Sequence, residues 1–207
     1  MRFRHATLTV ALTALPLVAT ATPAHALTCP LIADATGDAT TLGRFGPLQE
    51  PYPPLVVGLP TSRNADIVRA DVASGATTVV VQMQVASLDP DLFTLLGPEW
   101  FVAWDIGTNS YAVSTRQSGF GQPGYITAFR LNDTSAGSVT FTVDDANDTV
   151  TWTIDRSLLP DLATPGATFS YIHAGTKVFS GSTDFAPDWP VEPPDYVDQA
   201  PACIAAS

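Results

Sequence analysis

Three aspartates near the start of the chain have the chemistry of a cation site. Asp34 and Asp38 lie four residues apart around Gly37, and Asp66 opens a later apolar run. Carboxylates placed across a glycine turn can converge on one hard cation, and Ca²⁺ prefers several oxygen ligands. The pattern therefore predicts that these three residues could hold a structural calcium ion. The alternative is an ordinary turn, because aspartate and glycine are both common turn formers.

Two tryptophans offer a different chemistry. Trp100 and Trp104 would lie on one face of a single strand, ~13 Å apart at ~3.3 Å per residue. Exposed aromatic rings on a rigid sheet can stack on the apolar C–H face of a sugar, so this pair is a candidate carbohydrate site. The alternative is core packing, since large aromatic rings supply much of the buried area of small domains.

Met83 and His173 are the only methionine and histidine that remain once an N-terminal leader is removed. A thioether and an imidazole can together ligate a b-type haem. However, Met83 lies between Val81 and Val85, where core packing is a sufficient explanation. Haem therefore stays a minor alternative.

No sequence pattern indicates a catalytic centre. The chain has no Gly-x-Ser-x-Gly nucleophile turn and no His-Glu-x-x-His or Cys-rich zinc spacing. The acidic residues lie mainly in turn-like or proline-rich contexts, although a carboxylate pair that hydrolyses glycosidic bonds stays open. We therefore expect a protein that is not an enzyme.

The first 26 residues have the layout of a signal peptide. Arg2 and Arg4 precede an apolar stretch over residues 6–19, and the segment ends on a small-x-small sequence at Ala24 and Ala26. We expect residues 1–26 to be removed and residues 27–207 to form one secreted, extracellular domain. A chain of this length can build one substantial core.

The two cysteines, Cys29 and Cys203, lie at opposite ends of that domain. An oxidising compartment favours their pairing, which would bring the two ends together. In chain-entropy models a bridge over so long a loop contributes about 4–5 kcal/mol. The sequence therefore predicts a disulfide that closes the domain.

The charge balance argues against two classes of partner. The formal net charge is −11, and removing the two leader arginines makes it 7 − 20 = −13. Such an excess of acids repels nucleic acid and anionic lipid. No later apolar run reaches the ~20 residues of a membrane-spanning helix. We expect neither nucleic acid nor membrane as a partner, and no sequence feature indicates an oligomeric state.

Alternation of apolar and polar residues is the dominant pattern of the chain. It predicts strands over residues 67–73, 77–87, 100–106, 111–116, 125–131, 139–143, 150–154 and 168–173. A short helical turn is expected over 156–162, and proline-rich segments occupy 42–64 and 187–207. Short strands between turn signals indicate an all-β protein, a single antiparallel β-sandwich of jelly-roll or immunoglobulin-like type.

The order of these pieces resembles a known group of exported sandwiches. It runs from the Asp34–Asp38 turn through Asp66-Ile67 and Ala86-Ser87-Leu88 to the late Ile154-Asp155-Arg156-Ser157-Leu158-Leu159. This order is similar to that of the carbohydrate-binding module family 9-like and DOMON-like group. The resemblance implies a structural calcium near the first turn and two tryptophans that flank a sugar. It departs at Asp155, where the group usually has a proline.

Three functions follow from these observations. The leading hypothesis is a secreted, non-catalytic domain that binds a polysaccharide or a cell-surface component, stabilised by calcium. The second is an extracellular structural or protein-interaction domain on the same scaffold. The third is a b-type haem carrier. Exposure of Trp100 and Trp104 distinguishes the first from the second, and proximity of Met83 to His173 would favour the third.

Overall fold

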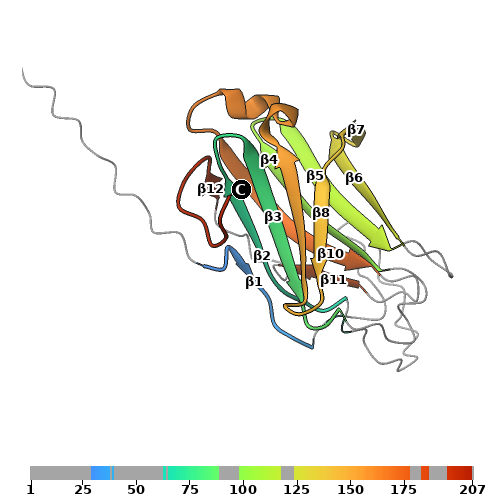
Figure 1. Ribbon diagram of the computed structural model, residues 1–207. Helices are drawn as coiled ribbons and strands as arrows, with labels where there is room; N and C mark the ends of the chain where they lie inside the picture. Colours follow the sequence, from blue (N-terminus) through green and yellow to red (C-terminus); the bar gives the residue numbers. More distant parts are fainter. Residues whose placement is uncertain are drawn as a thin grey trace, which may run out of the picture.

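The computed structural model describes residues 29–37, 39, 63, 65–88, 98–117, 124–177, 183–186 and 195–206. Their strands form two antiparallel sheets packed face to face, which confirms the predicted all-β sandwich (Figure 1). The predicted leader, Asp38, all but residue 63 of the proline-rich segment 42–64, and residues 187–194 of the second proline-rich segment lie outside the described residues. Within the described part of the chain, no helix has the length and apolar content to cross a membrane.

The smaller sheet, sheet A, has five strands in the order β1-β2-β3-β9-β8. Its strands are β1 (Ile32–Ala33), β2 (Ile67–Ser74), β3 (Thr78–Val85), β8 (Thr140–Asp144) and β9 (Thr149–Asp155). The strands predicted over residues 139–143 and 150–154 are confirmed as β8 and β9, which pair antiparallel, with Phe141 opposite Trp152 and Val143 opposite Val150.

The larger sheet, sheet B, follows the order β11-β10-β4-β5-β6-β7, and β12 also pairs with β10. Its strands are β4 (Glu99–Ile106), β5 (Asn109–Gln117), β6 (Tyr125–Leu131), β7 (Thr134–Gly137), β10 (Thr168–Lys177), β11 (Thr183–Ala186) and β12 (Tyr196–Val197). The short strands β1, β7, β11 and β12 were not predicted.

The core lies between the two sheets, and several strands, β4 most regularly, contribute every second residue to it. On β3 the inward residues are Val79, Val81, Met83 and Val85, all fully buried, as the sequence pattern predicts. The facing strand β4 turns alternate residues inward in the same way. A buried hydrogen bond joins the two sheets within the core, where the indole Nε1 of Trp152 on sheet A donates to Thr115 Oγ1 on sheet B at 2.7 Å. Burial on this scale is the main stabilising contribution to the fold.

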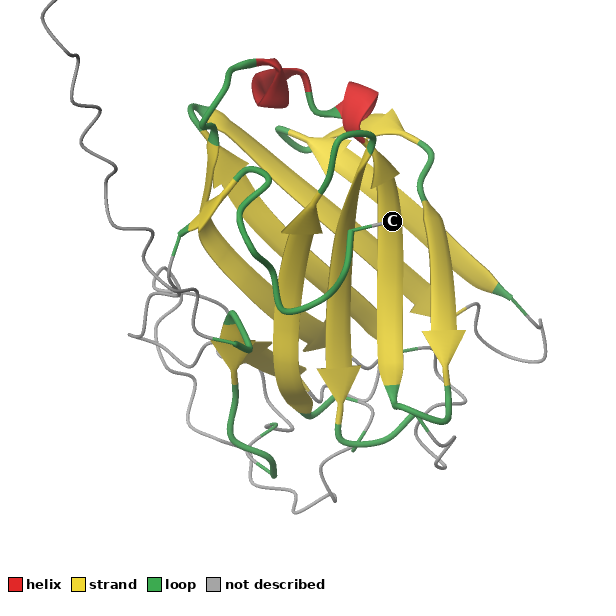
Figure 2. Cartoon of the chain, turned by 60° about the vertical axis from the view of Figure 1, so that its left-hand side comes forward, coloured by secondary structure: helices red, strands yellow, loops and turns green. Residues whose placement is uncertain are grey.

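Two short 3₁₀ helices follow β9 and lie together at one end of the sandwich (Figure 2). They are η2 (Arg156–Leu158) and η3 (Pro160–Ala163), which confirm the predicted helical turn. The side chain of Asp155 accepts the N–H of Ser157 and so caps the first helix. Pro160 begins the second, where its missing N–H costs nothing.

The predicted disulfide is present between Cys29 and Cys203, with their Cα atoms 5.3 Å apart. It joins the segment before β1 to the segment after β12. Both segments therefore lie against the same end of the β2–β3 pair, where Ser74 and Tyr196 are also hydrogen-bonded.

Candidate functional site

Both tryptophans of the candidate sugar site lie in the core. The exposed fraction is 2% for Trp100 and 1% for Trp104. The Trp104 ring stacks on Tyr111, with the centroids 6.1 Å apart, and also contacts Phe169. Both rings therefore pack in the core, which is the alternative considered from the sequence. Neither ring has an exposed surface on which a sugar could stack.

The aspartates of the candidate calcium site hold the first turn of the domain. Both carboxylate oxygens of Asp66 accept the N–H of Gly37, at 2.9 and 2.8 Å, and the backbone N–H of Asp34 donates to Val68 O at 3.0 Å. Asp38 lies outside the described residues. Among the residues that the structure does describe, no three His, Cys, Asp or Glu side chains are grouped as a metal site. Calcium at Asp34, Asp38 and Asp66 stays a prediction.

Met83 and His173 are not brought together. Met83 is fully buried on the inner face of sheet A, among Val81 and Val85. His173 is exposed on β10, opposite Ala103 of β4, on the side of sheet B that faces away from the core. Met83 therefore points into the core, whereas His173 points away from it. The two side chains do not form an axial pair for a haem iron.

Sheet B has more strands than sheet A, and we call the side of sheet B that faces away from the core the outer face. Pairing registers place residues of neighbouring strands side by side across it. Its centre consists of small side chains, namely Ala103 of β4, Ala112 and Ser114 of β5, and Ala128 of β6. Small residues on three adjacent strands make a shallow track on a rigid sheet.

An aromatic pair lies at the β11 side of this track. The Phe101 ring covers Gly175, since a Cβ added there would lie 2.1 Å from Phe101 Cζ. Phe101 also meets Phe185 edge to face, with the centroids 6.1 Å apart. Phe185 is 41% exposed. Because glycine has no side chain, the Phe101 ring can lie directly over position 175.

Tyr171 is the most exposed of the large apolar side chains in the described residues, at 63%. It sits in a β-bulge of β10 between Ser170 and His173, with φ +50°. A bulky residue in the left-handed region is uncommon and costs free energy, and such strain concentrates at functional positions. Bulges likewise re-aim side chains beside binding sites. Both observations single out this ring.

The bulge also fixes the orientation of His173. Its Nδ1 lies 2.9 Å from the carbonyl oxygen of Tyr171. Because a carbonyl oxygen can only accept, Nδ1–H donates this hydrogen bond. Nε2 is then the ring atom that can meet a ligand on the outer face.

Titratable groups with shifted pKa values lie away from the outer face, at structural contacts. Burial raises the pKa of Asp71, whose carboxylate accepts the N–H of Leu31 at 2.8 Å beneath the N-terminal segment. Burial and the neighbouring Asp161 carboxylate raise the pKa of Tyr111. Each shift has a structural cause, so none of these groups indicates an acid–base centre.

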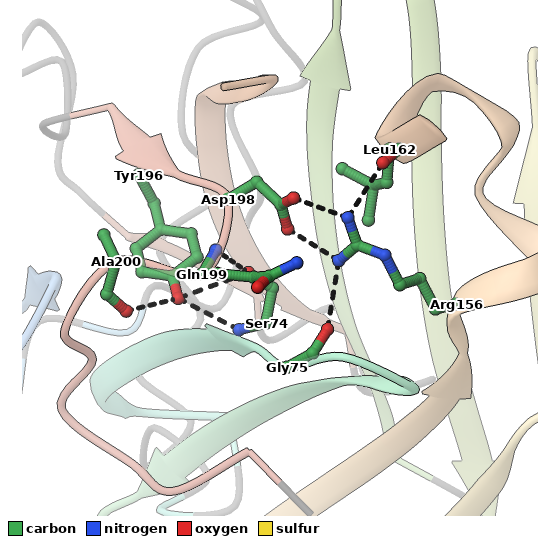
Figure 3. A network of polar contacts seen from close by, with 8 residues as sticks. All are labelled: Ser74, Gly75, Arg156, Leu162, Tyr196, Asp198, Gln199 and Ala200. Atoms are coloured by element: carbon green, nitrogen blue, oxygen red, sulfur yellow. Dashed lines mark hydrogen bonds and ion pairs between the residues drawn. The ribbon is translucent and has the colours of Figure 1, made fainter. Parts of the chain in front are cut away.

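The third such contact holds the C-terminal segment (Figure 3). Hydrogen bonds from Arg156 lower the pKa of Asp198, and the same pairing raises the pKa of Arg156. Nearby, Tyr196 Oη accepts the N–H of Ser74 at 3.0 Å and donates to Ala200 O at 2.9 Å. This network fastens residues 195–200 to the end of β2.

Comparison with protein-family models, curated proteins and solved structures finds no match to this chain. The resemblance to the carbohydrate-binding module family 9-like and DOMON-like group therefore stays a prediction. Phe101, Tyr171 and Gly175 were not singled out from the sequence. The signal that points to Phe101 was present, since it occupies the face of its strand opposite to Trp100 and Trp104.

Proposed function

We propose that this protein is an exported, non-catalytic carbohydrate-binding domain whose ligand lies on the outer face of sheet B. The observation that carries the proposal is Tyr171, which is 63% exposed and lies in a strained bulge of β10, the strand next to the track of small residues. Phe101 and Phe185 supply a second aromatic platform on the same sheet. The sugar site is thus assigned to these rings rather than to Trp100 and Trp104.

The chemistry of the outer face supports this assignment. A pyranose ring presents an apolar C–H face that matches an aromatic ring, and the polar tips of Tyr171 and His173 can bond its hydroxyl groups. The platform is built on hydrogen-bonded strands, so little conformational entropy is lost on binding. The disulfide between Cys29 and Cys203 supports export to an oxidising compartment.

The test is depletion of purified protein from solution by a panel of insoluble polysaccharides, with added calcium and with chelator. We expect selective retention by at least one polymer, reduced tenfold or more in Tyr171→Ala. The matched control is Thr142→Ala, an exposed position on the opposite side of the molecule, on β8 of sheet A. Equal loss in both variants, or no retention by any polymer, would contradict the proposal and favour a structural or protein-binding domain.

A further inference from the structure

We infer that the polysaccharide bound by the outer face is anionic and carries carboxylate groups, as in chains of uronic acid residues. The inference rests on the proposed function and specifies the class of its ligand. It follows from how the few basic residues of the chain are distributed.

The basic residues divide into two groups with different surroundings. Arg63 donates to the carbonyl of Ala86, Arg69 lies 3.8 Å from Asp71, and Arg156 binds Asp198. These three side chains make contacts within the folded domain. The other Lys and Arg side chains in the described residues are Arg116, Arg130 and Lys177.

All three of the remaining cations lie on the outer face. Lys177 pairs with Glu99 across β10 and β4, Glu99 pairs with Arg116 across β4 and β5, and Arg130 pairs with Ala112 across β6 and β5. All three basic side chains are exposed. Within the part of the chain that the structure describes, none of them comes within ion-pair distance of an acid.

The outer face therefore has a formal charge of the opposite sign to that of the described residues as a whole. Its acids are Glu99 and Asp105, so its formal charge is 3 − 2 = +1. The described residues as a whole hold 6 Lys or Arg and 14 Asp or Glu, a balance of 6 − 14 = −8. At physiological salt, charges more than ~8 Å away are largely screened. A ligand on the track thus responds mainly to the local cations.

The spacing of the cations suits a chain that carries several separate charges. Neighbouring strands lie ~4.8 Å apart and residues along a strand ~3.3 Å apart. From the register, Arg116 and Arg130 are therefore ~14 Å apart at Cα, and Arg116 and Lys177 are ~10 Å apart. Such distances are too long for one small anion and fit carboxylates repeated along an extended glycan. A guanidinium can bind each carboxylate through two parallel hydrogen bonds.

The same observations disfavour nucleic acid as the polyanion. Duplex DNA carries one negative charge per ~1.7 Å of axis, so most of its charges would have no counter-charge on a face whose three cations lie ~10–14 Å apart. A glycan with one carboxylate per sugar has a lower charge density. It can follow the outer face without bringing as many charges near the acidic remainder of the protein.

The test compares a soluble polyuronate with its carboxyl-reduced, neutral counterpart, because the two share one backbone. We expect the folded protein to bind the polyuronate at least tenfold more tightly, with an affinity that falls as salt is raised. The variant with Arg116→Gln, Arg130→Gln and Lys177→Gln should lose that tenfold preference and keep the weaker affinity for the neutral chain. Arg116→Lys with Arg130→Lys retains the charge and should restore part of the preference.

The outcomes separate this inference from the function on which it rests. Equal affinity for the two polymers, independent of salt, would overturn the anionic ligand and leave carbohydrate binding intact. Failure to bind either polymer, together with no retention in the insoluble panel, would overturn both. Single-stranded DNA that competes with the polyuronate at equal concentration of charges would assign the face to nucleic acid and also overturn the inference.

Discussion

Arg156 and Asp198 form a two-pronged ion pair across 42 residues of chain, in which the guanidinium Nη1 lies 2.7 Å from Asp198 Oδ1 and Nη2 contacts Oδ2. Nη1 also donates to the carbonyl of Gly75 at 3.1 Å, and Nη2 to that of Leu162 at 2.8 Å. One side chain thus joins the β2–β3 turn, the 3₁₀ helices and the C-terminal segment. Figure 3 shows the guanidinium facing both the carboxylate and the backbone carbonyls.

Asp198→Asn should lower the free energy of unfolding by about 2–3 kcal/mol, because Arg156 would keep its charge in a partly buried position without a full counter-charge. Urea denaturation at pH 7 measures this change. A loss below ~0.5 kcal/mol would show the pair to be no stronger than an exposed surface pair.

The same pair predicts a pH dependence. Arg156 holds the pKa of Asp198 below its ordinary value of 3.8. A carboxyl group with a lowered folded-state pKa stabilises the protein above the unfolded-state value, and this contribution is lost as pH falls through the folded-state value. The stability difference between wild type and Asp198→Asn should therefore be constant from pH 7 to about pH 5 and shrink below about pH 4. A difference that grows on acidification would contradict this origin.

Asp71→Asn should raise the free energy of unfolding at neutral pH, whereas Asp198→Asn should lower it. Burial raises the pKa of Asp71, so its charged form costs stability at neutral pH, and the asparagine oxygen can still accept the N–H of Leu31. A raised carboxyl pKa means that the folded state holds the proton more tightly, so wild type gains stability as pH falls toward 3.8. We expect the variant to be more stable than wild type at pH 7 and equal to it near pH 3. Lower stability of the variant at pH 7 would contradict this.

The disulfide closes a loop with a sequence separation of 174 residues. Replacing both Cys29 and Cys203 by serine should lower the free energy of unfolding by about 4 kcal/mol, mainly because the unfolded chain gains freedom. Equilibrium unfolding with and without reductant checks the value, and reductant should have no effect on the serine variant. Because the bridge and Arg156 hold the same terminal segment, combining this variant with Asp198→Asn should not give an additive loss.

Gly175→Ala tests the aromatic platform directly. The new methyl group would overlap the Phe101 ring, since its position lies 2.1 Å from Phe101 Cζ. We expect a loss of about 1–3 kcal/mol, the usual range for overpacking. In a Phe101→Ala background the same substitution should cost less than half as much, because the obstructing ring is gone. Equal costs in the two backgrounds would mean that Phe101 does not lie over Gly175.

Much of the fold was predictable because alternation of apolar and polar residues over five or more positions indicates a strand. The strands β2, β3, β4, β5, β6, β8, β9 and β10 were all predicted. In contrast, β1 and β12 have two residues each and β7 and β11 have four. Strands so short have too few residues to show a period, and they form because a neighbouring strand offers hydrogen-bonding groups.

The candidate site was harder to predict, for a geometric reason. The sequence places Trp100 and Trp104 on the same face of β4, but only the second sheet decides which face of β4 is buried. Phe101 and Gly175 are far apart in sequence and meet through the register of β4 and β10. The bulge at Tyr171 likewise depends on that register, and no local residue pattern predicts it.

The most direct measurement of the central claim is backbone amide chemical-shift mapping during titration with a soluble fragment of whichever polysaccharide retains the protein. We predict saturable shifts on the outer face of sheet B, at Ala103, Ala112, Ala128, Tyr171 and Gly175. The outer side of sheet A, at Thr142 and Thr151, should stay unperturbed. Shifts confined to sheet A or to the 3₁₀ helices, with the outer face of sheet B unchanged, would contradict the assignment.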